Sequence, residues 1–492
     1  MKRYLLGLDI GSSSVKAALV DCDSGKTLDT VQSPADEMAI QARHPGWAEQ
    51  DPGRWWHHVV EAIHLLLRRS GVDAGAIQSV GIAYQMHGLV CLDKNKEVVR
   101  PAIIWCDSRA ARVGARAFRE LGPDYCLKNF LNSPGNFTLS KLRWVRENEP
   151  ATYARIAHVL LPGDYIAFRL TGELFTTTTG LSEAVCWNFS KKKPASELLR
   201  HYEIDPALLP PLVPVFEVQG AVTTAAAAAT GLKAGTPIAY RAGDQPNNAF
   251  SLNVLNPGET AATAGTSGVI YSVTDKNAFD PKSRVNTFVH VNNQKGVLLC
   301  INGTGILNSW LRRNLGTGSG TYTYEEINRH AAGVSAGADG LCFYPFGNGS
   351  ERIFENRLTN ARLEGLDFNR HNQAHMLRAA QEGIVFGLYY GFEILREMGV
   401  STTTVKAGYA NMFLSPVFRE AFVNTLNVPL ELYETSGATG AAIGAGVGSG
   451  YYKSTREAFM GLNKLHSEIP NRALFDQYAS AYAHWRKGLR TR

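Results

Sequence analysis

The sequence predicts an α/β protein that folds as two domains. Three observations support this: the chain has 492 residues, strand-like and helix-like segments alternate along it, and one opening pattern occurs twice. A single hydrophobic core stops growing at about 250–300 residues, so a chain of this length divides. Alternating strands and helices are typical of a sheet covered by helices. We expect residues 1–245 to form the first domain and residues 246–492 the second, with the join near 245–258.

The first domain opens with a strand, a loop of small residues and a second strand. Residues 4–10 and 15–20 are apolar runs of strand length, and the polar segment 21–26 turns the chain into a third strand. This arrangement differs from the strand-turn-helix of P-loop and Rossmann units. Residues 55–69 then show apolar positions at helical spacing, and residues 80–84 have the composition of another buried strand.

The alternation continues through the join, and the opening pattern then recurs. We expect helices near residues 139–148, 223–230 and 246–255, and strands near residues 159–161 and 237–240. The turn Asn256-Pro257-Gly258 ends the last of these helices. Strand 259–264, the small-residue loop 265–268 and strand 269–273 follow directly. We interpret this as a structural repeat, one copy of which opens each domain.

Two loops of small residues have the chemistry of phosphate sites. Asp9 lies at the end of the first strand and opens the loop Asp9-Ile10-Gly11-Ser12-Ser13-Ser14, which offers backbone N–H groups and hydroxyls. A carboxylate beside such a loop suits Mg²⁺ and a phosphate. The second loop, Gly265-Thr266-Ser267-Gly268, has the same character without the carboxylate. Each loop alone is equally explained as a tight turn, but the occurrence of both favours a clamp on a triphosphate.

Two other polar segments follow predicted strands. Asp244 lies between a strand and a helix at the domain join, where it either caps the helix or faces a ligand. Gln85, Met86 and His87 follow a buried strand, which is where α/β proteins place ligand contacts. A purely structural turn would have the same composition.

Charge and cysteine usage exclude several classes of protein. The net charge of +6 is small and its basic residues are dispersed, whereas nucleic-acid binders concentrate them on one face. The seven cysteines are scattered without a C-x-x-C pair, which excludes a disulfide framework and a zinc site. Asp9 interrupts the N-terminal apolar run before signal-peptide length, and no run approaches the roughly 20 apolar residues of a membrane span. We expect a cytoplasmic protein without nucleic-acid or membrane partners.

Together the motifs resemble those of the FGGY carbohydrate kinases over nearly the whole chain, and most of all the members that phosphorylate xylulose. The matching stretches are residues 7–16, 46–52, 81–88, 100–109, 161–165, 243–244 and 265–269. Their order and spacing carry the resemblance. Within it, Gln85-Met86-His87-Gly88 is typical of the xylulose kinases.

The resemblance implies two actin-like, ribonuclease-H-like domains with an active-site cleft between them. It implies a kinase that uses ATP and Mg²⁺ to phosphorylate a ketopentose, with D-xylulose giving D-xylulose 5-phosphate as the first choice. The N-terminal domain would hold the sugar and the first phosphate loop, and the C-terminal domain would hold ATP. A small-molecule sugar and ATP are then the partners, and relatives suggest a homodimer.

The resemblance also assigns site residues by position. It implies Asp244 as the catalytic base and Asp9 as a second catalytic carboxylate, both of them metal contacts. The implied sugar contacts are Gln85, Met86, His87, Trp105, Asp244 and Gln245. The implied ATP contacts are Gly11, Ser12, Ser13, Lys16, Gly265, Thr266, Ser267, Gly408 and Asn411.

Two departures from the family pattern keep alternatives open. Xylulose kinases generally have Asn after Gly-Asp, whereas Gln245 stands here, as in the glycerol kinases of the family. Tyr409 replaces a glycine of the adenosine-binding loop, where it would stack on adenine, narrow the site or lie outside it. The alternatives are a kinase of ribulose, a hexulose or glycerol, and a non-catalytic protein that binds ATP and sugar. An actin-like or chaperone-like protein would need interfaces that the sequence does not show.

Overall fold

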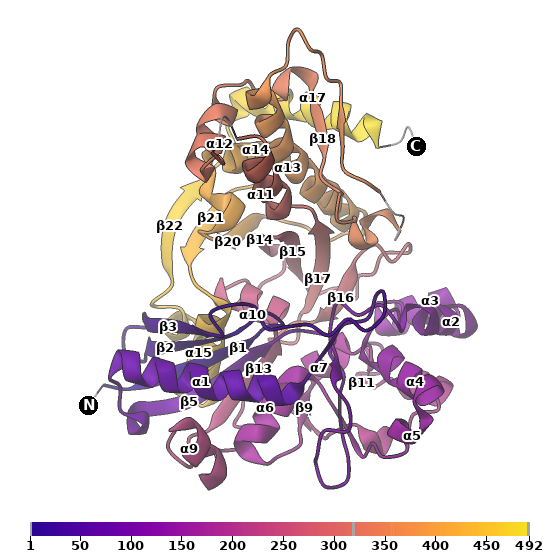
Figure 1. Ribbon diagram of the computed structural model, residues 1–492, viewed down its shortest axis with the longest axis vertical. Coiled ribbons are helices and arrows are strands. Elements are labelled where there is room, and N and C mark those ends of the chain that lie inside the picture. Colours follow the sequence, from indigo (N-terminus) through magenta and orange to yellow (C-terminus); the bar gives the residue numbers. More distant parts are fainter. Residues whose placement is uncertain (1, 317–319, 356, 358, 490–492) are drawn as a thin grey trace. The chain divides into compact units, whose positions relative to one another are not determined.

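The computed structural model of the protein describes residues 2–316, 320–355, 357 and 359–489. Its chain divides into two compact units, whose elements are labelled in Figure 1. Unit 1 comprises Met1–Asn253, Phe288–Lys295 and Thr435–Leu462. Unit 2 comprises Val254–Thr287, Gly296–Glu434 and Asn463–Arg492. Both units are α/β, as expected.

A five-stranded sheet with the order β13-β5-β1-β2-β3 forms the centre of unit 1. Strands β1 (Tyr4–Ile10), β2 (Val15–Asp21) and β3 (Thr27–Ser33) form an antiparallel meander. Strands β5 (Ile77–Tyr84) and β13 (Ile238–Gly243) run parallel to β1. Strand β5 is buried along almost its whole length, which accounts for its continuous apolar run.

The other elements of unit 1 surround this sheet. Its helices are α1 (Pro52–Ser70), α2 (Ala111–Leu121), α3 (Pro123–Phe130), α4 (Thr138–Asn148), α5 (Pro150–Tyr153), α6 (Pro162–Thr171), α7 (Thr178–Glu183), α8 (Ser196–His201), α9 (Thr224–Thr230), α10 (Asp244–Ser251), α15 (Gly437–Gly448) and α16 (Thr455–Ala458). Its short strands are β4 (Glu49–Gln50), β6 (Val90–Leu92), β7 (Ala102–Ile103), β8 (His158–Leu160), β9 (Thr176–Thr177), β10 (Trp187–Asn188), β11 (Lys193–Pro194) and β12 (Leu212–Val213).

Most of the elements expected in this half are present. Helix α1 begins earlier than expected, because Asp51 caps it by accepting a hydrogen bond from Gly53 N at 2.8 Å. It ends at Ser70, and the C-cap residue Gly71 has a left-handed φ of 65°. Helix α10 begins at Asp244 and ends at Ser251, so Asp244 is the first helical residue and not the cap before it.

Helix α15 shows that the compact units are discontinuous in sequence, which differs from a single boundary at 245/246. Its backbone lies so close to the unit 1 sheet that a Cβ on Gly7 would come within 1.8 Å of Ala438 O. A Cβ on Gly81 would come within 2.0 Å of Ala441 O. Glycines on the strands and small residues on the helix allow this approach, so a segment near the C-terminus packs with the N-terminal sheet.

Unit 2 contains a seven-stranded sheet with the order β16-β17-β15-β14-β20-β21-β22. Its strands are β14 (Glu259–Ala264), β15 (Ser267–Thr274), β16 (Asn286–Val289, whose last two residues belong to unit 1), β17 (Lys295–Asn302), β18 (Cys342–Tyr344), β19 (Arg362–Glu364), β20 (Thr404–Gly408), β21 (Leu430–Glu434) and β22 (Asn463–Glu468). Its helices are α11 (Gly305–Asn314), α12 (Tyr324–Ala332), α13 (Gln373–Glu397), α14 (Pro416–Leu426) and α17 (Arg472–Gly488). Its apolar core includes residues of α13, α14 and α17.

The predicted repeat is confirmed by the strand pairing. In unit 1, β1 pairs antiparallel with β2 and parallel with β5. In unit 2, β14 pairs antiparallel with β15 and parallel with β20. Each unit therefore opens with a hairpin whose first strand is also a parallel neighbour of a later strand. In the described part of the chain, no helix combines the length and the apolar character that crossing a membrane requires.

Candidate active site

Three strands of unit 1 end at the same edge of its sheet and bring the predicted sugar and metal residues together. In the parallel register, Asp9 pairs with Ala83, and Ala83 pairs with Ala242. Asp9, the turn after Tyr84 and Asp244 therefore occupy neighbouring positions at the carboxyl ends of β1, β5 and β13. This is the edge at which α/β sheets place their ligands.

Asp244 combines a buried position with a neighbouring negative charge. Burial and, second, the charge of Asp9 raise the pKa of its carboxyl to about 7, against the opposing effect of hydrogen bonds from Gln245. Both causes disfavour the ionised form. The predicted metal pair Asp9 and Asp244 is thus close enough to interact electrostatically, and Gln245 is a direct neighbour of the carboxylate.

Asp9 lies between a lysine and the start of a helix. Burial raises the pKa of Asp9, and the positive charge of Lys16, its cross-strand partner on β2, opposes the shift. The carboxylate also lies against the first residue of α15, because a Cβ on Gly437 would come within 2.3 Å of Asp9 Oδ2. A helix N-terminus carries partial positive charge, which favours a carboxylate at this place.

His87 is held in an unusual backbone conformation in the turn after β5. Its φ is 62°, in the left-handed region that residues with a Cβ seldom adopt. Its ring Nδ1 lies 2.9 Å from Glu183 O, and its ring packs against Phe137 and Phe288 at centroid distances of 4.8 and 5.3 Å. A carbonyl oxygen only accepts, so His87 Nδ1 donates this hydrogen bond.

Met86 and Gln85 connect this turn to its surroundings in different ways. Met86 is buried against the end of β13, where a Cβ on Gly243 would come within 2.5 Å of its Cγ. Gln85 is buried as well, and its Nε2 lies 3.5 Å from Gln50 Oε1. The predicted contact Met86 therefore lies directly beside the residue before Asp244, whereas Gln85 points toward Gln50.

The first small-residue loop is fixed by side chains from two other segments. Gln50 Nε2 donates to Ser12 O at 2.7 Å, and Trp105 Nε1 donates to Ser12 Oγ at 3.4 Å. Gly11 N donates to Ser14 O at 3.0 Å and closes the loop on itself. Trp105 is 49% exposed. Ser13, like Lys16 on β2, is exposed. Gln50 lies in a stretch that carries the family resemblance, but nothing in the sequence tied it to this loop.

The sequence analysis did not identify Glu183, a buried residue whose carboxyl group lies close to Asp244. Burial, then the charges of Asp244 and Asp164, raise the pKa of Glu183 well above its usual range. A Cβ on Gly243 would come within 2.6 Å of Glu183 Oε2. Arg241 Nε lies 3.2 Å from Asp164 Oδ1, and its positive charge compensates the charge of the Asp164 carboxylate. The only available signal was polar residues inside otherwise apolar segments.

The second small-residue loop lies in unit 2, beside the start of α11. Gly305 N donates to Gly265 O at 2.7 Å, and Ile306 N donates to Thr266 O at 3.4 Å. Ser267 Oγ donates to Asn302 Oδ1 at 3.2 Å. The first two residues of α11 therefore hold the predicted loop through its carbonyl groups. The start of α11 at Gly305 is not among the elements that the sequence predicts.

The predicted nucleotide residues Gly408 and Asn411 lie on the neighbouring strand end of unit 2. Strand β20 runs parallel to β14 and ends at Gly408, and Asn411 follows with a φ of 55°. A Cβ on Gly265 would lie 3.5 Å from Asn411 Nδ2, so the two loops adjoin. A Cβ on Gly408 would meet no atom within 4 Å. The Tyr409 side chain is 41% exposed.

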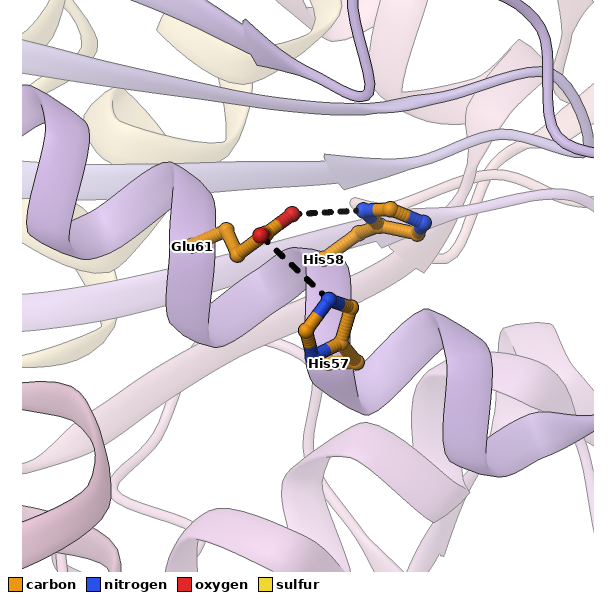
Figure 2. Close-up of side chains that lie close together, drawn as sticks. All are labelled: His57, His58 and Glu61. Atoms are coloured by element: carbon orange, nitrogen blue, oxygen red, sulfur yellow. Dashed lines mark hydrogen bonds and ion pairs between the residues drawn. The ribbon is translucent and has the colours of Figure 1, made fainter.

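A separate group of possible metal ligands lies on helix α1. Among the described residues, His57, His58 and Glu61 are the one set of three such side chains whose ligand atoms lie within 4.8 Å of one another. Figure 2 shows the Glu61 carboxylate between the two imidazoles, at 3.3 Å from His57 Nε2 and 3.0 Å from His58 Nδ1. Ser33 Oγ also donates to Glu61 at 2.8 Å. Ordinary hydrogen bonds account for this cluster.

Comparison with known proteins places the chain in a family. The profile for the FGGY family of carbohydrate kinases, N-terminal domain, matches residues 4–251, and that for the C-terminal domain matches residues 260–449. The chain is 31% identical to the xylulose kinase of Bacillus subtilis (strain 168), over 98% of this chain and 97% of the relative. It is also 31% identical to the L-xylulose/3-keto-L-gulonate kinase of Escherichia coli (strain K12), over 99% and 96%.

The solved structures agree with this placement. A xylulose kinase from Brucella ovis superposes with a TM-score of 0.89 at 27% sequence identity, over 99% of this chain and 98% of that chain. Two family profiles that together span most of the chain and full-length relatives above 30% identity support one conclusion. The protein belongs to the FGGY family of carbohydrate kinases, and it is a sugar kinase that takes a sugar and ATP as its small-molecule partners.

Proposed function

We propose that this kinase transfers the γ-phosphoryl group of ATP to a ketopentose, with D-xylulose as the first choice and D-xylulose 5-phosphate as the product. The observation that carries the proposal is the Asp244 carboxyl, with its pKa near 7, at a strand end shared with Asp9 and the Met86-His87 turn. A base whose pKa is close to neutral accepts a proton efficiently at neutral pH.

In the proposed reaction Asp244 accepts the proton of the sugar hydroxyl as that oxygen attacks the phosphoryl group. A sugar hydroxyl is a weak nucleophile, so a hydrogen-bonded carboxylate increases its reactivity. We assign Met86, His87 and Trp105 to the sugar, because Met86 and His87 lie in the turn at this strand end and Trp105 carries an apolar indole ring. Gln245 adjoins the base, and Gln85 acts through Gln50 on the first loop.

Magnesium fits the carboxylates at this edge of unit 1. Asp9 and Asp244 offer hard oxygen ligands, and the repulsion that raises the pKa of Asp244 is what a divalent cation would relieve. We propose that these two residues hold the ion that accompanies ATP. When bound, it would neutralise charge on the β- and γ-phosphates.

We assign the phosphates to the first loop in unit 1, at Gly11, Ser12 and Ser13 with the nearby charge of Lys16. The contacts of unit 2 with the nucleotide are assigned to Gly265, Thr266, Ser267, Gly408 and Asn411. The half-exposed Tyr409 ring would then be available for stacking on adenine. The cleft between domains and the homodimer implied by the resemblance stay predictions.

The comparison with one Escherichia coli relative favours a second candidate for the sugar acceptor. The Escherichia coli relative named for L-xylulose and 3-keto-L-gulonate is as similar to this chain, at 31% identity, as the Bacillus subtilis xylulose kinase. Gln245, in place of the usual Asn, also alters the surroundings of the base. L-xylulose or a keto-acid sugar is therefore the alternative to D-xylulose.

A coupled ADP-release assay over an acceptor panel tests the proposal. The panel contains D-xylulose, L-xylulose, D-ribulose, L-ribulose, 3-keto-L-gulonate and glycerol, with acceptor-free and Mg²⁺-free reactions as controls. We expect the highest kcat/KM with D-xylulose and no turnover without Mg²⁺. Preference for L-xylulose or 3-keto-L-gulonate would select the alternative, and turnover with glycerol alone would refute a ketopentose kinase.

A further inference from the structure

Lys141 is a fully buried lysine in the first turn of α4. Its exposure is 0%, and burial lowers the pKa of its ammonium to about 7, although the charge of Asp107 opposes the shift. Burying a cation is unfavourable unless hydrogen bonds or an opposite charge compensate. Asp107 is itself paired with Arg109 at 2.7 Å. Because Asp107 already pairs with Arg109, the hydrogen bonds of the Lys141 ammonium are what compensate for its burial.

The ammonium donates to two backbone carbonyls. Lys141 Nζ lies 2.8 Å from His87 O and 2.9 Å from Ile104 O. A lysine ammonium has three donors and no acceptor, so one side chain can join two carbonyl groups that are far apart in sequence. Hydrogen bonds from an ionised donor are also stronger than those between neutral groups.

Both carbonyls belong to loops that carry proposed sugar contacts. His87 lies in the turn after β5, and Ile104 directly precedes Trp105. The bases of the two loops are already paired, since Leu89 and Ile103 exchange backbone hydrogen bonds of 2.9 and 3.2 Å. Lys141 connects the same two loops at the carbonyls of His87 and Ile104, which take no part in the pairing of Leu89 with Ile103.

A second residue of the same helical turn contacts the first of these loops. Thr138 Oγ1 donates to Gly88 O at 3.3 Å. The left-handed φ of His87 is unfavourable for a residue with a Cβ and persists only where the surroundings hold it. The start of α4 supplies these restraints at the carbonyls of His87 and Gly88, while Glu183 O holds the ring.

We propose that Lys141 is a positioning residue for the sugar acceptor: its ammonium holds the turn at His87 and the loop at Trp105 in the arrangement that the sugar requires. Lys141 acts through these two residues and does not itself contact the sugar. The inference rests on the proposed function, because that function assigns His87 and Trp105 to the acceptor.

The substitution Lys141→Met tests the proposal, because methionine has a similar apolar chain but no donor. We expect KM for the acceptor to rise about 10- to 100-fold, the range that follows from small misplacement of binding groups. KM for ATP should not change. Lys141→Gln keeps an amide donor on a shorter chain, and its acceptor KM should fall between those of wild type and Lys141→Met.

The matched control is Ser140→Ala in the same turn of α4. Ser140 is buried, but its hydroxyl contacts Tyr202 OH at 2.7 Å and Pro134 O at 3.1 Å, and neither lies in the two loops. We expect this variant to lower Tm and to leave both KM values unchanged. A general loss of stability in α4 would affect the control as well, so the acceptor KM separates positioning from stability.

Two outcomes overturn the proposal: an unchanged acceptor KM in Lys141→Met, or equal increases in the KM values for acceptor and ATP. If the variants do not fold, hydrogen exchange on the wild-type protein decides, with the best acceptor of the panel as the probe. Binding should slow exchange in residues 85–88, 104–107 and 138–141 together, and slowing confined to one segment refutes the connection.

The assay also separates this inference from the proposed function. Wild-type protein that phosphorylates no ketopentose refutes the proposed function, and the Lys141 variants are then measured with whichever acceptor is active. Wild-type protein that phosphorylates a ketopentose, together with an unaffected Lys141→Met variant, refutes the positioning role alone.

Discussion

Asp244 shows how its surroundings turn an ordinary carboxylate into a candidate base. Burial and, second, the charge of Asp9 together raise its pKa to about 7. A neutral hydroxyl loses its proton more readily to a base with a pKa near 7 than to one near 4. Asp9 thus has two proposed roles, because it would hold magnesium and also tune the base.

The pH dependence of the acceptor's kcat/KM should show this tuning. Only the ionised form of Asp244 accepts a proton, and without magnesium its pKa is raised to about 7, so activity should be lost at acidic pH, and bound magnesium should move this loss to lower pH. The substitution Asp9→Asn removes a charge that raises the pKa of Asp244, so the residual activity of this variant should persist to lower pH. The measurement is a pH–rate profile of both proteins. An acid limb in the wild type at or below the pH of the limb in Asp9→Asn would contradict this reading.

At the scale of elements, close packing between glycines decides how the sheet edge of unit 1 is built. Helix α15 approaches β1 and β5 so closely that Gly7 and Gly81 have no room for a Cβ. The helix in turn brings its first residue, Gly437, against Asp9. Backbone packing in this unit thereby places a helix N-terminus beside a proposed magnesium ligand.

The substitution Gly81→Ala should destabilise unit 1, since its Cβ would overlap Ala441 O at 2.0 Å and force the helix away from the sheet. Overpacking of this kind costs about 1–3 kcal/mol. Gly333→Ala is the matched control, because its nearest contact is an ordinary 3.4 Å and its φ is −76°. Chemical denaturation of both variants checks the difference. Equal stability of Gly81→Ala and wild type would contradict the packing described.

Local sequence signals predicted the strands and the loops but not the packing between distant segments. Strands β1, β5 and β13 are apolar runs bounded by turns, and this pattern is visible in the sequence. Helix α15 consists almost entirely of small residues and has no apolar stripe, so periodicity gave no sign of the sheet that it covers. The small residues of α15 allow its close approach to β1 and β5, and this role is visible only in the folded structure.

The same limit applies to the candidate site. The positions of Asp9 and Asp244 near strand ends could be predicted because each lies beside an apolar run, while their roles stay predictions. The buried group of Asp164, Glu183 and Arg241 could not, because its members come from three separate elements. Lys141 likewise reads as one of many polar residues on an amphipathic helix, and only the fold shows which carbonyls it contacts.

At the scale of the whole molecule, the compact units do not follow the order of the chain. Unit 1 includes Phe288–Lys295 and Thr435–Leu462 as well as the N-terminal half. Phe288 packs on His87, and α15 packs on the sheet, so both returning segments contribute to the candidate site of this unit. Folding of the N-terminal half should therefore depend on these two segments, which are synthesised after it.

A fragment of residues 1–245 should fail to fold as a stable domain, because its sheet would lose the cover of α15 and expose the apolar face. We expect aggregation or a non-cooperative thermal transition by circular dichroism, whereas the full chain should unfold cooperatively. Adding a peptide of residues 435–462 is the complementary test. A soluble fragment with a sharp transition and full sugar affinity would show that the first predicted domain is autonomous.

The most direct test of the central claim is a comparison of Asp244→Asn with wild type in one experiment. Sugar binding is measured by calorimetry, and phosphoryl transfer is measured by ADP release on the same preparations. Because asparagine keeps the shape and the hydrogen-bonding capacity but cannot accept the proton, we expect sugar affinity to be nearly retained. Turnover should fall by roughly 10²–10⁴-fold. Wild-type turnover in the variant would remove Asp244 from the role of base.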